Sequence, residues 1–182
     1  IFMEKIKVVI IGVGIRGRYT YGNYFEKNKN LYEVVAVVEN KIGRRNKFQE
    51  IFNLPQNRVF ENLDDFFKVE KIAHAVIISS IDNTHYDAAV KSLKKGYNVL
   101  VEGPVANSLD KLVNLENICE ENKDRDIWSY FEIKTEEVIS QDNIKKMKSY
   151  LKDIVEIKPI ITSEYEENNI DVKEKSMAQL FN

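Results

Sequence analysis

Short apolar runs recur along the first 131 residues, and each run ends at a glycine or a polar residue. They occupy residues 6–11, 31–38, 58–60, 75–78, 97–101 and 127–131. Runs that are mostly apolar rather than alternating are typical of strands buried on both faces of a parallel sheet. We therefore predict six strands at these positions.

Helical patterns lie between the strands. Residues 84–95 carry an apolar face, with Asn83 or Thr84 as the expected N-cap, and Ser108 is the expected N-cap of a second helix over 109–121. Strands that alternate with helices of this length require right-handed crossovers. The pattern predicts an α/β fold with a doubly wound parallel sheet.

The end of the chain differs from this pattern, because all seven glycines fall within the first 103 residues. Periodicity predicts a helix over 143–151 and a strand over 154–162. We expect two domains, 3–131 and 132–182. The second is too short to build its own sheet, so we expect strand 154–162 to pair with a second copy in a homo-oligomer, or with a partner chain.

Composition narrows the classes of function. The 27 Lys and Arg residues balance 29 Asp and Glu residues, which argues against a nucleic-acid partner. No apolar run approaches the roughly 20 residues that span a bilayer, so no membrane partner is expected. The single cysteine, Cys119, lacks the companions of a metal site or disulfide and falls on an apolar helix stripe. We expect a cytoplasmic protein with Cys119 in its core.

A glycine-rich loop follows the first strand. Gly12, Gly14 and Gly17 have G-x-G-x-x-G spacing, with Ile15 and Arg16 between the last two, and a helical stretch begins there. In this context the glycines permit a tight turn, the approach of a pyrophosphate to the backbone, and close packing of the helix. The motif predicts the cofactor-binding loop of a Rossmann fold; a mere tight turn is the alternative.

An acidic residue ends the second strand at the spacing that this fingerprint requires. Glu39 lies 22 residues after Gly17, and its carboxylate is a candidate acceptor for the hydroxyls of the adenosine ribose. This favours NAD over NADP. Arg44 and Arg45 are near enough in sequence to receive a 2′-phosphate, so NADP stays open, and an ordinary solvated helix face is the alternative for both arginines.

Four ordered stretches resemble the N-terminal domain of the Gfo/Idh/MocA oxidoreductases. They are the glycine loop, residues 35–39, residues 75–80 with His85 after them, and residues 99–106. The resemblance implies hydride transfer between a nicotinamide cofactor and a sugar-like or polyol-like small-molecule substrate. It also implies that residues 132–182 are a short helix–strand remnant of a second α+β domain, which in the family binds substrate.

The same resemblance extends the expected cofactor site beyond the loop. The added residues are Ser79, Ser80, Asp82, His85 and Glu102. His85 has a second interpretation as a polar residue in the first turn of a helix. The three tyrosines after the glycine loop, Tyr19, Tyr21 and Tyr24, receive no role.

Two departures from the family pattern bear on activity. The usual Thr-Pro-Asn is replaced by Ser80-Ile81-Asp82, and Gly103 occupies the place of the lysine in Glu-Lys-Pro. Glycine cannot donate a proton, and no histidine follows His85, so no catalytic residue is assigned. We expect a weakly active or inactive oxidoreductase, or alternatively a non-catalytic dinucleotide-binding or regulatory protein. A methyltransferase is a weaker alternative, because residues 102–104 argue against it.

Overall fold

One six-stranded parallel sheet forms the centre of this computed structural model, which describes residues 4–122, 124 and 127–130. The strands are β1 (Ile6–Ile11), β2 (Tyr32–Val38), β3 (Val59–Phe60), β4 (Ala75–Ile78), β5 (Asn98–Glu102) and β6 (Ile127–Tyr130). Their order across the sheet is β3-β2-β1-β4-β5-β6, and every neighbouring pair is parallel. All six predicted strands are confirmed, and so is the doubly wound α/β fold of Rossmann type.

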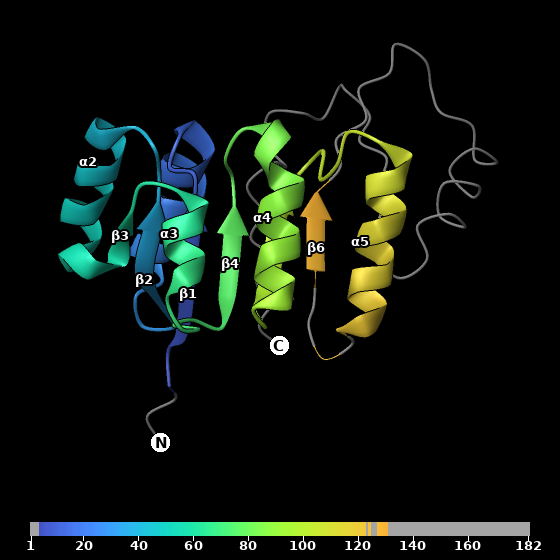
Figure 1. Cartoon of the computed structure of the whole chain (residues 1–182). Coiled ribbons are helices and arrows are strands. Elements are labelled where there is room, and N and C mark those ends of the chain that lie inside the picture. Colours follow the sequence, from blue (N-terminus) through green and yellow to red (C-terminus); the bar gives the residue numbers. More distant parts are fainter. Residues whose placement is uncertain (1–3, 123, 125–126, 131–182) are drawn as a thin grey trace, which may run out of the picture.

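Helices cover both faces of the sheet (Figure 1). They are η1 (Arg16–Gly22), α1 (Asn23–Lys27), α2 (Ile42–Phe52), η2 (Gln56–Arg58), α3 (Leu63–Lys68), α4 (Asp82–Lys94) and α5 (Leu109–Glu121). In Figure 1, α3, α4 and α5 lie along the near face. The short helix η1 has π-helical geometry and continues directly into α1, because the residues at their junction keep right-handed helical angles.

Side-chain alternation along β1 explains the two layers of core. Val9 and Ile11 belong to the cluster that also contains residues of α3, α4 and α5, whereas Val8 and Ile10 belong to the cluster beneath α1 and α2. All four side chains are 3% exposed or less. Burying one such side chain contributes about 1.5–3 kcal/mol. The mostly apolar run in the sequence therefore follows from burial of both faces of the strand.

The helix starts test the capping predictions. Ser108 caps α5, where its hydroxyl accepts a hydrogen bond from the Lys111 N–H, so this prediction is confirmed. The prediction of Asn83 or Thr84 as the cap of α4 is wrong, because α4 begins at Asp82. The Thr84 hydroxyl instead donates to the Ile81 carbonyl, three residues earlier, which lets a threonine sit inside the first turn.

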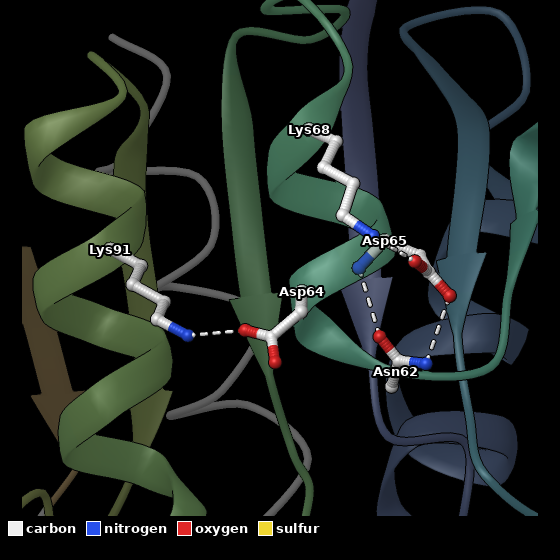
Figure 2. Close-up of polar contacts among 5 residues, drawn as sticks. All are labelled: Asn62, Asp64, Asp65, Lys68 and Lys91. Atoms are coloured by element: carbon white, nitrogen blue, oxygen red, sulfur yellow. Dashed lines mark hydrogen bonds and ion pairs between the residues drawn. The ribbon is translucent and has the colours of Figure 1, made fainter.

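A polar cluster joins α3 to α4 on the outer surface (Figure 2). The Asn62 side chain caps α3 by accepting from the Asp65 N–H, and Lys68 pairs with Asp65 at 2.8 Å. Lys91 of α4 reaches Asp64 of α3 at 2.7 Å. Hydrogen bonds from these lysines lower the pKa of Asp64 and Asp65. Because the groups are exposed, each pair adds little stability.

The predicted second domain, 132–182, lies outside the described residues. Helix 143–151 and strand 154–162 therefore stay predictions, as does the pairing of that strand with a partner. Over the described ranges, no helix is long and apolar enough to cross a membrane. Within the same residues, no three His, Cys, Asp or Glu side chains gather as a metal site would require.

Candidate dinucleotide site at the carboxyl edge of the sheet

The glycine loop lies against the turn that follows β4. Gly12 has a φ of +84°, and a Cβ there would lie 2.5 Å from the backbone N and Cα of Ser80. A Cβ on Gly17 would lie 2.0 Å from the carbonyl oxygen of Gly12. Both contacts are with backbone that cannot move aside. The first and third glycines are therefore required by the fold itself.

Gly14 differs from these two glycines, because a Cβ there would meet no backbone and only the end of one flexible side chain. The nearest atom to a Cβ at this position is Nη1 of Arg44, at 3.6 Å, and the φ of Gly14 is not positive. The first N–H groups of the helix that follows, from Ile15 to Gly17, have no intrahelical acceptor. Glycine here is thus unnecessary for the fold, but it leaves a backbone surface that a pyrophosphate can approach.

The turn after β4 holds the loop in place. The Ser79 hydroxyl donates to the Gly12 carbonyl at 2.7 Å, and the Ser80 hydroxyl bonds the Thr84 hydroxyl at 2.7 Å. Asp82 is exposed in the first turn of α4. The structure therefore brings the two predicted serines beside the glycine loop, with Asp82 at the neighbouring helix start.

His85 is buried, with 1% of its surface exposed. Its Nδ1 lies 3.0 Å from the Pro104 carbonyl and its Nε2 lies 3.0 Å from the Ser80 carbonyl. The ring thus links the turn after β4 to the turn after β5. His85 lies in the first turn of α4, and its contact with a cofactor stays a prediction.

Glu39 lies at the carboxyl end of β2, beside the loop. Its Oε2 accepts from the Val13 N–H at 2.9 Å and its Oε1 accepts from the Lys41 N–H at 2.9 Å. The residue is 7% exposed. Nη1 of Arg45 donates to the Glu39 carbonyl at 2.5 Å, whereas Arg44 is exposed. The carboxylate is therefore fixed at the expected edge, although each oxygen already has one donor.

Glu102 ends β5 and connects it to the first helix. Its Oε2 accepts from Nη1 of Arg16 at 2.6 Å, and its Oε1 accepts from the Tyr21 hydroxyl at 2.6 Å. Burial, followed by the Glu102 charge, raises the pKa of Tyr21 well above its usual range. The sequence analysis assigns no role to Tyr21. The available signal was its position four residues after Gly17, which places both on the helix face toward the sheet.

Comparison with known proteins identifies the domain. The sequence profile of an oxidoreductase family with an NAD-binding Rossmann fold, Gfo/Idh/MocA, matches residues 6–131. The chain belongs to this family. Its resemblance to the family, first seen in four short stretches, is thereby confirmed over most of the described residues.

Individual relatives are distant. The chain is 25% identical over 120 residues to the uncharacterized protein YMR315W of Saccharomyces cerevisiae, an alignment of 65% of this chain and 34% of that protein. Scyllo-inositol dehydrogenase from Lactobacillus casei, solved with NAD(H) and scyllo-inositol, superposes with a TM-score of 0.63 at 19% identity, over 69% of this chain and 36% of the enzyme. The WlbA dehydrogenase from Chromobacterium violaceum was solved with NADH and UDP-GlcNAcA. It superposes with a TM-score of 0.63 at 18% identity, over 71% of this chain and 36% of that protein.

The chain thus spans about a third of the length of these relatives. Within the Gfo/Idh/MocA pattern, Gly103 lies between Glu102 and Pro104, and the Gly103–Pro104 peptide is cis. Both Glu102 oxygens already accept hydrogen bonds. Among the described residues we assign no group that is free to act as a general acid at this end of the site.

Proposed function

We propose that this chain is a weakly active or inactive NAD-binding oxidoreductase of the Gfo/Idh/MocA type, whose reaction is hydride transfer between a nicotinamide cofactor and a sugar-like or polyol-like hydroxy compound. The observation that carries this proposal is the backbone at Gly14, beside the start of η1, where a Cβ would meet only the flexible Arg44 side chain at 3.6 Å. The remaining residues fit the same cofactor, because Glu39 and Glu102 lie at the carboxyl ends of β2 and β5. When bound, NAD would supply the hydride acceptor.

We further propose NAD as the preferred cofactor. The Glu39 carboxylate is held at the end of β2 by two backbone N–H groups, where it can accept the ribose hydroxyls and repel a 2′-phosphate. NADP is the less favoured alternative. It is supported by the exposed residue Arg44, whose Nη1 lies 3.6 Å from the Cβ position of Gly14.

A second candidate function is non-catalytic dinucleotide binding, in a regulatory role. It is favoured by Gly103, which supplies no side chain next to Glu102, and by the engagement of both Glu102 oxygens. The two candidates make the same prediction for cofactor binding. They differ only in turnover, because positioned acid–base groups contribute on the order of 10²–10⁴ in rate.

Isothermal titration calorimetry of the 182-residue chain with NAD, NADH and NADP tests the binding proposal. We expect the two NAD forms to bind more tightly than NADP. If none of the three binds, the proposed function is wrong; if NADP binds more tightly, only the role of Glu39 is wrong. A turnover assay with sugars and polyols then separates the two candidates: slow cofactor-dependent turnover supports the oxidoreductase, and no detectable turnover supports the non-catalytic role.

A further inference from the structure

Arg16 is the one residue of the glycine motif whose side chain reaches another strand's end in a described contact. It lies immediately before Gly17, yet its guanidinium pairs with Glu102 at the end of β5. β4 separates β1 from β5 in the sheet. The helix that begins at Arg16 therefore reaches the carboxyl end of β5, two strands away from β1.

The side chains of Arg16, Tyr21 and Glu102 differ in exposure. The Glu102 side chain is 8% exposed and Tyr21 is buried, whereas the Arg16 side chain is 46% exposed. The Tyr21 hydroxyl donates to Oε1 of Glu102 at 2.6 Å. Arg16 has five N–H donors, and the contact with Glu102 uses Nη1. The buried acid thus holds a guanidinium whose other donors are available at the surface.

The direction in which a dinucleotide lies along the carboxyl edge of the sheet decides which of its groups the remaining N–H donors of Arg16 face. Its adenosine half lies toward β2, where Glu39 is, and its pyrophosphate lies at the start of the helix after β1. The nicotinamide half must then extend the other way, over β4 and β5. Arg16 lies on that side of the glycine loop.

We propose that Arg16 binds the phosphate on the nicotinamide side of the dinucleotide, and that Glu102 and Tyr21 are positioning residues that hold its guanidinium there. This inference rests on the proposed function. A guanidinium suits the task because it donates two parallel hydrogen bonds to a phosphate. The competing explanation is that Arg16 only neutralises the buried Glu102 carboxylate.

A double-mutant cycle on the 182-residue chain separates the two explanations. Arg16→Met, Glu102→Gln and the double variant are titrated by calorimetry with NAD, ADP-ribose and AMP. Lys27→Met is the control, because it removes one positive charge from an exposed position at the end of the same helical run. The melting temperature of each variant without ligand checks that it is folded.

Binding by Arg16 predicts a loss in both backgrounds. In the Glu102→Gln background, Arg16→Met lowers affinity for NAD and ADP-ribose about tenfold, which corresponds to about 1.4 kcal/mol. Affinity for AMP, which lacks that phosphate, is unchanged, and Lys27→Met leaves all three affinities unchanged. Tyr21→Phe lowers NAD affinity severalfold through Arg16 without affecting AMP.

Three other results would contradict the proposed role of Arg16. If Arg16→Met has no effect once Glu102 is Gln, the arginine only neutralises the carboxylate and the inference is wrong. An equal loss for AMP would place Arg16 on the adenosine half instead, which also overturns it. If the wild-type chain binds none of the ligands, the proposed function itself fails and the inference fails with it.

Discussion

The three glycines of the loop are expected to respond differently to the same added methyl group. A Cβ at Gly14 would have only an ordinary contact, 3.6 Å from Arg44, whereas a Cβ at Gly17 would lie 2.0 Å from the carbonyl oxygen of Gly12. Gly43, in α2, has no atom within 4 Å of its Cβ position and serves as the matched control. Alanine substitutions at Gly14, Gly17 and Gly43 therefore separate binding from folding.

The magnitudes follow from these distances. Gly14→Ala should leave the free energy of unfolding unchanged or raise it by about 0.4–1 kcal/mol, because the unfolded chain loses conformational freedom. Gly17→Ala should lower it by about 2 kcal/mol or more, since neither backbone segment can yield. Gly43→Ala should raise it by less than about 1 kcal/mol, because Gly43 lies in the first turn of α2 rather than in the helix interior.

The effects of these substitutions on NAD affinity should differ from their effects on stability. A methyl group at Gly14 keeps the pyrophosphate away from the loop and removes about two hydrogen bonds to a charged group, each contributing about 1.5–3 kcal/mol. We therefore expect a loss of about 100-fold or more for Gly14→Ala and none for Gly43→Ala. Urea denaturation measures the free energy of unfolding, and calorimetry measures the NAD affinity.

Two results would refute this reasoning. Undiminished NAD affinity in a folded Gly14→Ala protein would mean that the pyrophosphate lies elsewhere. A Gly17→Ala protein as stable as the wild type would mean that the loop does not pack against itself as described.

Three further predictions concern single groups. Because burial and the Glu102 charge raise the pKa of Tyr21, the unfolded chain loses this proton first as pH rises. Above about pH 10, the free energy of unfolding should therefore fall more steeply for the wild type than for Tyr21→Phe in urea denaturation; equal slopes would contradict it. Burial and the Glu116 charge raise the pKa of Cys119, so iodoacetamide should alkylate the folded chain much more slowly than the urea-unfolded chain. The 182-residue chain should show turnover about 100-fold or more below that of a family member with the lysine of Glu-Lys-Pro, because Gly103 carries no proton-transfer group, and robust cofactor-linked turnover would disprove this.

The elements of the fold were predictable because their signals are local. A strand buried on both faces is mostly apolar along its length, which placed β1 and β4 with the bounds that the structure has. The start of α4 was misplaced by two residues, since a threonine that bonds back to a carbonyl in the first turn resembles a cap. Helix α3 has only six residues and no long apolar stripe, so its bounds were not predicted.

The alternation of strands and helices, the glycine spacing and the acid at residue 39 can be read from the sequence, because each depends on neighbours along the chain. The contacts of Tyr21 and Arg16 with Glu102 cannot, because 81 and 86 residues separate these partners. The same holds for the crowding at Gly12 and Gly17 and its absence at Gly14. These contacts depend on the strand order, which brings the ends of β1, β4 and β5 to one edge of the sheet.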